Sequence, residues 1–295
     1  MDLDTLATTV ARHPIALWLL GMTAGALLGS GALWALKTLR HRPSPVRHLL
    51  HAASATTVML LSMAAAACAL LAGGALMAEL AEGWQRTGTW SRVDEGIAQQ
   101  LRLHADMAAL RWFGALTHLG DTAVLTTLTL AVTAALWWRR HRLLAVGWLV
   151  AMAGNGLLTK ILKDVFARVR PEQKLALVEG FKDVFARVRP EHVHGAAQAD
   201  GFSFPSGHSS ASMVAYAMLA YLAVRLLPRA WQVPAVCCAG ALIFTTGWSR
   251  VVLHVHYVSD VLAGWVLGGT WMVCTVLIMD SMARWRGAPA ALARQ

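Results

Sequence analysis

Long runs of hydrophobic residues alternate with shorter polar segments along the whole chain. The runs lie at about 14–36, 52–78, 121–138, 143–162, 207–227, 231–248 and 259–279. Most are close to about 20 residues long, the length that an α-helix needs to cross a bilayer. No small-residue cleavage site follows the first run, so we count it as a helix and not as a signal peptide. The pattern predicts an all-α integral membrane protein, a helical bundle with about six to seven transmembrane helices.

The segment between the second and third runs has a different pattern. Apolar residues recur there at helical spacing with charged residues between them, at Ile97, Leu101, Ala105, Ala108 and Trp112. This pattern is typical of an amphipathic helix on the membrane surface, and a plain structural connection fits it as well. We therefore divide the chain into N-terminal membrane helices with this outer-face segment (1–120), a core (121–280) and a cytoplasmic tail (281–295).

Composition and charge support a membrane protein and orient it. Hydrophobic residues make up 57% of the chain and charged residues 14%, against about 25% charged residues in soluble domains. In a seven-helix arrangement the basic residues of four segments fall on one side, which the positive-inside rule makes cytoplasmic. They are Lys37, Arg40, Arg42, Arg47, Arg139, Arg140, Arg142, Arg225, Arg229, Arg284, Arg286 and Arg294. We expect a multi-pass membrane protein with its N-terminus outside and its C-terminus in the cytoplasm.

The same features exclude other classes of ligand. The basic residues are spread over loops, not over one folded face, so we expect no nucleic-acid binding. The four cysteines lie inside hydrophobic runs and have no CxxC spacing, which indicates neither a disulfide framework nor a zinc site. The two His-x-His pairs, at 192–194 and 254–256, have no carboxylate-rich shell near them. We expect no metal, no other cofactor and no obligate protein partner.

A ten-residue sequence, KDVFARVRPE, is present twice, at 163–172 and at 182–191. In each copy the lysine and the second arginine are seven residues apart, so they share one face of a helix that continues through them. These pairs are Lys163 with Arg170 and Lys182 with Arg189. Two cations on one face beside a membrane indicate an anion site, although a cationic cap on a membrane helix has the same pattern.

A second polar element, FSFPSGHSS at 202–210, has the features of a helix start. Free backbone N–H groups at Ser206 and Gly207 would attract a phosphate, and glycine would let it approach closely. His208 follows directly, within reach of a bound anion. A simple capped helix is the alternative.

The third polar element is SRVVLHVHYVSD at 249–260. Arg250 can donate two hydrogen bonds to phosphate oxygens. His256 and Asp260 are four residues apart and therefore neighbours on a helix. A carboxylate that fixes one imidazole nitrogen leaves the other as a nucleophile, although a structural pair has the same spacing. All three elements fall on the outer side, which indicates a phosphate site with a nucleophile and an acid.

The three elements together resemble the signature of the type 2 phosphatidic acid phosphatase superfamily, shared with vanadium haloperoxidases and bacterial acid phosphatases. Its pattern is Lys-x6-Arg-Pro, then Pro-Ser-Gly-His, then Ser-Arg-x5-His-x3-Asp, and every fixed position is matched within roughly 163–260. The chain departs from the family only in carrying the first motif twice. Copy one extends a membrane helix without a break, so we expect Lys163 and Arg170 to be used, with Lys182 and Arg189 as the alternative.

The resemblance implies a role for each motif residue. His256 would attack phosphorus and carry a phosphohistidine, with Asp260 orienting it. His208 would protonate the leaving oxygen and later activate water. The first-motif cations, Ser206, Gly207 and Arg250 would hold the phosphoryl oxygens.

The resemblance also implies the activity. We expect a metal-independent phosphatase of the bacterial inner membrane, acting at the outer, periplasmic face on a lipid phosphate or pyrophosphate. Phosphatidic acid, phosphatidylglycerol phosphate and polyprenyl pyrophosphate all fit. The alternatives are a vanadium-type haloperoxidase and a non-catalytic protein that binds or transports lipid phosphates.

Overall fold

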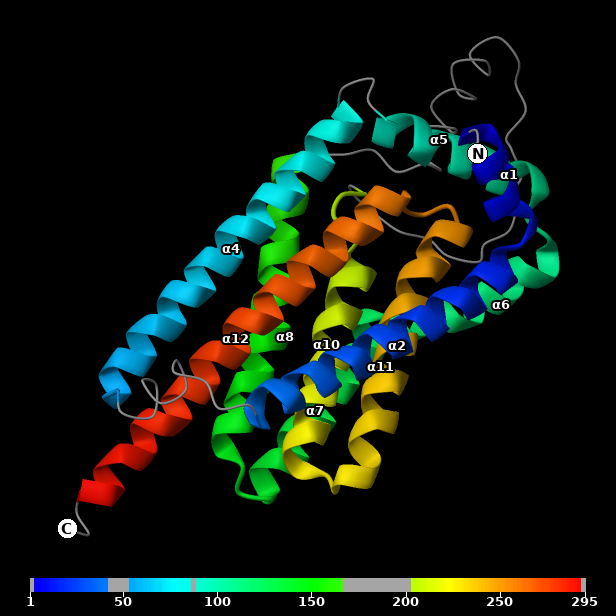
Figure 1. The fold of residues 1–295 in the computed structure, drawn as a ribbon. Helices are drawn as coiled ribbons and strands as arrows, with labels where there is room; N and C mark the ends of the chain where they lie inside the picture. The colour runs from blue at the N-terminus through cyan, green and yellow to red at the C-terminus, as the bar shows by residue number, and fades with distance from the viewer. Residues whose placement is uncertain (1–2, 42–52, 86–88, 167–202, 293–295) are drawn as a thin grey trace.

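The chain is described by a computed structural model over residues 3–41, 53–85, 89–166 and 203–292. Within these ranges it is built from α-helices joined by short turns (Figure 1). The elements are α1 (Leu3–Arg12), α2 (Pro14–His41), α4 (Ala55–Gln85), α5 (Thr89–His104), α6 (Met107–Thr117), the 3-10 turn η1 (His118–Gly120), α7 (Thr122–Trp138), α8 (Arg142–Phe166), α10 (Gly207–Leu226), α11 (Arg229–Val252) and α12 (Val258–Leu292).

Seven helical stretches in these ranges are long and apolar enough to cross a membrane. They are Pro14–Thr38, Ala55–Ala81, Met107–Trp138, Arg142–Lys163, Gly207–Leu226, Arg229–Val252 and Val258–Trp285. The prediction of an all-α membrane bundle is confirmed. The last helix continues to Leu292 instead of ending near residue 279, so most of the predicted tail is helical. The helix continues beyond the hydrophobic run because Ala, Met and Arg are good helix formers in water as well.

The predicted single amphipathic helix across residues 97–112 is wrong. Ala105 and Asp106 interrupt it, and Asp106 has the extended backbone of an N-cap before α6. The third stretch accordingly comprises α6, η1 and α7, and begins well before residue 121. Ile97 and Leu101 of α5 are buried in a cluster that includes Ala7 and Ala11 of α1. The apolar face of α5 therefore packs against protein, as a structural connection would.

Glycines bring the helices of the bundle close together. A Cβ on Gly240 of α11 would lie 2.4 Å from the carbonyl oxygen of Gly25 in α2. A Cβ on Gly264 of α12 would lie 2.6 Å from the carbonyl oxygen of Ser206, and one on Gly268 would lie 2.5 Å from that of Ser210. Small residues at helix crossings allow such close backbone contact in membranes. The start of α10 is therefore fixed directly against the start of α12.

The direction of the helices brings the polar elements together. The ends of α8 and α11 and the starts of α10 and α12 lie at one end of the bundle, near α1 and α5 (Figure 1). The turns between α7 and α8 and between α10 and α11 lie at the other end (Figure 1). The three polar elements of the sequence thus share one end, as predicted.

Candidate active site

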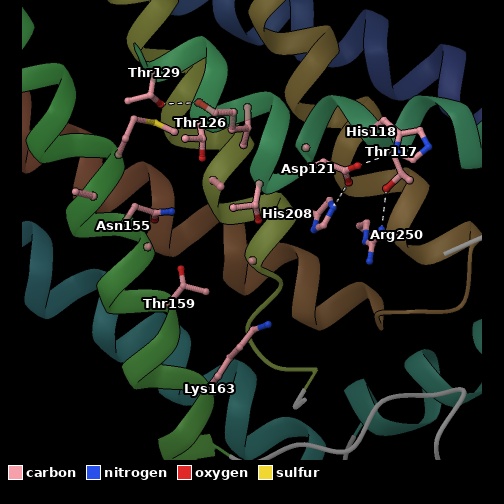
Figure 2. A pocket seen from close by; sticks show the side chains of 18 of the residues that line it. Thr117, His118, Asp121, Thr126, Thr129, Asn155, Thr159, Lys163, His208 and Arg250 are labelled. Carbon is pink, nitrogen blue, oxygen red and sulfur yellow. Dashed lines mark hydrogen bonds and ion pairs between the residues drawn. The ribbon is translucent and has the colours of Figure 1, made fainter. Parts of the chain in front are cut away.

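A cavity of about 670 Å³ opens at this end of the bundle (Figure 2). Charged and polar side chains line one part of it, namely Asp121, Lys163, His208, Arg250 and His256. Apolar side chains from the membrane-spanning parts of α7 and α8 line another part, among them Leu125, Leu130, Leu149 and Met152. A cavity of this kind suits a ligand with a charged head and a hydrocarbon tail.

His256 and Asp260 form a buried pair at the start of α12. Nδ1 of His256 lies 3.4 Å from Oδ2 of Asp260, and the side chains are 2% and 0% exposed. The backbone N–H of Tyr257 donates to the same carboxylate oxygen at 2.9 Å, and that of His256 donates to the carbonyl of Arg250 at 3.2 Å. With Nδ1 facing the carboxylate, Nε2 is the nitrogen that can act as a nucleophile.

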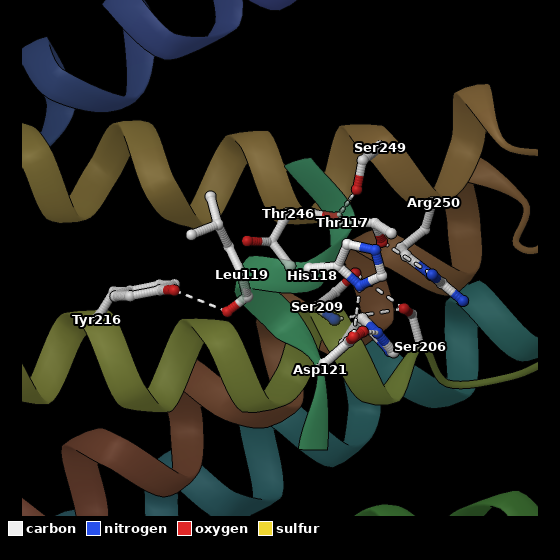
Figure 3. Close-up of polar contacts among 11 residues, drawn as sticks. Thr117, His118, Leu119, Asp121, Ser206, Ser209, Tyr216, Thr246, Ser249 and Arg250 are labelled. Atoms are coloured by element: carbon white, nitrogen blue, oxygen red, sulfur yellow. Dashed lines mark hydrogen bonds and ion pairs between the residues drawn. The ribbon is translucent and has the colours of Figure 1, made fainter. Parts of the chain in front are cut away.

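The start of α10 provides a helix N-terminus beside a lysine. Ser206 is the N-cap and accepts hydrogen bonds from the N–H of Ser209 at 3.4 Å and from its hydroxyl at 2.9 Å (Figure 3). The N–H of Ser206 donates to the carbonyl of Asp260 at 3.0 Å, which joins this start to that of α12. A Cβ on Gly207 would lie 3.8 Å from Nζ of Lys163. An ammonium and a helix N-terminus that face one space favour an anion there.

Arg250 reaches the cavity from the end of α11. Its side chain is 2% exposed, and Nη1 donates to Oγ1 of Thr117 at 2.8 Å. Thr117 belongs to α6, so the α6–η1 turn holds the guanidinium in place. A guanidinium fixed in this way is prepared for a phosphoryl group without further ordering.

Asp121 connects two histidines at the cavity, and the motifs did not include it. Nε2 of His208 lies 3.0 Å from Oδ1 of Asp121, and Nδ1 of His118 lies 2.7 Å from Oδ2 (Figure 2). A Cβ on Gly120 would lie 2.3 Å from Cγ2 of Thr246 and 3.0 Å from Cδ2 of His208, so this position has no room for a side chain beside the imidazole. The signal in the sequence was HLGD, a polar interruption between apolar stretches, but no spacing connects residue 121 with residue 208.

Two further buried polar groups near the site were also missed. Asp94 of α5 is 1% exposed and accepts hydrogen bonds from the N–H and the hydroxyl of Ser259 at the start of α12. Asn155 of α8 lines the cavity and accepts a hydrogen bond from Ser210 at 2.5 Å. Neither contact follows from a local sequence rule, because each joins segments far apart in the chain.

Part of the duplicated motif lies within the described residues. Lys163 is in the last turn of α8, whose preceding turns are embedded in the bundle, and it lines the cavity. Arg170, Lys182 and Arg189 lie outside the described residues, so their roles stay predictions. His254 has φ of 60°, and burial, followed by the charge of Arg102, lowers its pKa. It therefore adds no further cation to the site at neutral pH.

The part of the chain that contains the described motif residues is similar to known proteins. Residues 142–283 match the family model of the PAP2 superfamily. Phosphatidylglycerophosphatase B of Bacillus subtilis (strain 168) is 34% identical over 155 residues, which cover 52% of this chain and 66% of that protein. Lipid A 1-phosphatase of Rhizobium etli is 33% identical over 131 residues, 42% of this chain and 45% of that protein. The chain thus spans slightly less than two thirds and about half of these two relatives.

A solved structure extends the likeness to the fold. The crystal structure of a transmembrane PAP2-type phosphatidylglycerolphosphate phosphatase from Bacillus subtilis is similar to this one. The TM-score is 0.59 and the sequence identity 25%, over 72% of this chain and 96% of that one. Together with the two phosphatase relatives, this supports the prediction of a phosphoric monoester hydrolase in a multi-span membrane protein. The predicted resemblance to the PAP2 superfamily is therefore confirmed over residues 142–283, which contain all the described motif residues.

Proposed function

We propose that this protein is a membrane lipid phosphatase that removes a phosphate from a lipid phosphate or pyrophosphate through a phosphohistidine intermediate. The observation that carries the proposal is the cavity itself. It combines a buried His256–Asp260 pair and two cations with an apolar lining from α7 and α8. The names of both phosphatase relatives refer to lipid phosphates, which supports the same class of substrate.

In the first half of the reaction, Nε2 of His256 attacks phosphorus. The bond between phosphorus and the lipid oxygen breaks, and that oxygen takes a proton from His208. Asp260 stabilises the positive charge that develops on His256, because it accepts from the opposite nitrogen. Lys163, Arg250 and the N-terminus of α10 neutralise the phosphoryl oxygens, so the chemistry is mainly positioning and charge stabilisation.

In the second half, His208 takes a proton from water, and the resulting hydroxide attacks phosphorus. The bond between phosphorus and Nε2 breaks, which releases inorganic phosphate and restores His256. Three fixed positive groups can replace the neutralising role of a metal ion, so we infer a metal-independent reaction. We place the site on the periplasmic side, because the basic loops lie at the opposite end of the bundle.

The test is phosphate release from a panel of lipid phosphates and pyrophosphates with EDTA present. Purified wild type should release phosphate, and His256→Ala should lower kcat by at least about 10³-fold, because the covalent route is lost. With a radiolabelled lipid phosphate as substrate, wild-type protein quenched without acid should carry a labelled phosphoryl group. The His256→Ala variant should carry none. The proposal would be contradicted if wild type released no phosphate from any lipid, or if the variant were as active as wild type. Either result would favour a binding or transport role.

A further inference from the structure

A second polar position lies in the cavity on the same helix as Lys163. Asn155 is eight residues before Lys163 on α8, so its backbone lies about 12 Å further into the membrane. Its side chain lines the cavity, although the residue is only 2% exposed. Figure 2 shows Asn155 and Lys163 on the same helix, with the lysine side chain directed toward His208.

A chain of hydrogen bonds fixes the orientation of the Asn155 amide. The hydroxyl of Thr159 donates to Oγ of Ser210 at 3.4 Å, and the hydroxyl of Ser210 donates to Oδ1 of Asn155 at 2.5 Å. Each hydroxyl has a single proton, so the order of donors is determined. The amide oxygen accepts from Ser210, and the amide NH₂ is the group of Asn155 that can donate.

The amide NH₂ of Asn155 is available to a ligand. Among the residues that the structure describes, Ser210 is the one hydrogen-bond partner of the Asn155 side chain. Polar side chains at membrane depth usually mark functional sites. The donor is therefore placed to bind an acceptor that the substrate brings into the cavity.

The position of Asn155 limits which lipids can supply that acceptor. The phosphate is held by Lys163 and its neighbours, and the hydrocarbon lies against apolar residues such as Leu149 and Met152. Asn155 lies between these regions along α8. A diacylglycerol-type or acylated-sugar phosphate carries ester carbonyl oxygens a few bonds from phosphorus. A polyprenyl phosphate or pyrophosphate has only hydrocarbon at the depth of Asn155, because the second phosphate of a pyrophosphate lies directly beside the first.

We propose that Asn155 is a specificity-determining residue that donates a hydrogen bond to an acyl ester carbonyl of the substrate, so that the enzyme favours acylated lipid phosphates over polyprenyl phosphates. This inference rests on the proposed phosphatase function. It selects one of the substrate classes that the motif residues leave open, because those residues contact the phosphate that all the candidates share.

The experiment pairs a change in the enzyme with a change in the lipid. Phosphate release is measured with diacylglycerol phosphate, with its dialkyl ether analogue, which lacks both carbonyl oxygens, and with a polyprenyl phosphate and its pyrophosphate. Wild type should prefer the ester over the ether by about 2- to 10-fold in kcat/KM, the effect of one neutral hydrogen bond. Asn155→Leu keeps the side-chain size and should bring this ratio close to one. Thr133→Val is the matched control, because its hydroxyl bonds to the carbonyl of Thr129 in its own helix, and its ratio should equal that of wild type.

A second variant keeps the test decisive if Asn155→Leu does not fold. Ser210→Ala retains the amide but removes the donor that orients it, so it should lower the ester-to-ether ratio by less than Asn155→Leu does. An unchanged ratio in the folded variants, or a wild type that prefers polyprenyl phosphate, overturns the inference while phosphatase activity stands. A wild type that releases no phosphate from any lipid overturns the proposed function, and this inference with it.

Discussion

Two histidine–aspartate pairs face the cavity, and their surroundings differ. The His256–Asp260 pair is 2% and 0% exposed, whereas His208 and Asp121 are 25% and 35% exposed. A buried nucleophile is protected from side reactions and keeps a fixed geometry. A proton donor that must later activate water has to be reached by water. The difference in exposure therefore matches the division of roles that we propose between the two histidines.

Asp121 is expected to act through His208 as a positioning residue. Asp121→Asn should lower kcat on lipid phosphates by about 10- to 100-fold, part of the roughly 10²–10⁴ that acid–base catalysis supplies. The carboxylate fixes the imidazole and favours its protonated form, and the amide does this less well. The loss should be much smaller with an aryl phosphate, whose leaving oxygen needs no proton.

The control for Asp121 is available in the same cluster. His118 contacts the other oxygen of Asp121 and its side chain is 66% exposed, so His118→Gln should change kcat little. Asp121→Glu should restore part of the activity if a carboxylate at this position is what matters. Equal losses on alkyl and aryl phosphates would show that Asp121 is structural and does not assist proton transfer.

The histidines, Arg250 and Lys163 could be predicted because their motifs are local, with fixed spacing on helix ends. Lys163, Gly207, His208, Arg250 and His256 do line one cavity in the structure. Asp121 and Asn155 could not be predicted, because their partners are 87 and 55 residues away in the chain. Such contacts depend on how α7, α8 and α10 pack, and hydrophobic periodicity does not specify that packing.

At the scale of the helices, the site depends on how closely α10 and α12 approach. Ser206 and Asp260 are joined by a backbone hydrogen bond of 3.0 Å, and Gly264 lies one turn further along α12 against the carbonyl of Ser206. The phosphate-binding helix start and the nucleophile pair are therefore placed by the same helix crossing. A change at this crossing should affect activity as well as stability.

Gly264→Ala is expected to destabilise the protein by about 1–3 kcal/mol, because its Cβ would press on backbone and not on a flexible side chain. Thermal unfolding in detergent should show a lower Tm, and phosphate release should fall with it. Gly74→Ala is the matched control, since no atom lies within 4 Å of its added Cβ. The packing argument would fail if both variants unfolded at the wild-type temperature.

The hydrophobic runs predicted the membrane helices well, because bilayer thickness sets their length. The same runs gave no indication of α1, whose sequence LDTLATTVAR alternates apolar and polar residues over too short a stretch. They also did not show that α6 joins α7 through η1, because His118 and Asp121 interrupt the hydrophobicity there. Short amphipathic helices are determined by the neighbours that cover them, as α1 covers α5 here.

At the scale of the whole molecule, charge is distributed unevenly between the two ends of the bundle. Arg139, Arg140 and Arg142 lie at the turn between α7 and α8, and Arg225 and Arg229 flank the turn between α10 and α11. Both turns lie opposite the cavity end (Figure 1). By the positive-inside rule, this distribution supports the proposed periplasmic site, which substrate would enter from the outer leaflet.

This orientation can be tested by labelling single cysteines in intact cells with a membrane-impermeant thiol reagent. The four native cysteines are first replaced by alanine, and activity is checked in the resulting protein. Asp106→Cys, in the exposed break between α5 and α6 near the cavity end, should be labelled in intact cells. His141→Cys, in the exposed turn between α7 and α8, should be labelled only after the membrane is permeabilised. The reverse pattern would place the site in the cytoplasm, and the substrate would then have to come from the inner leaflet.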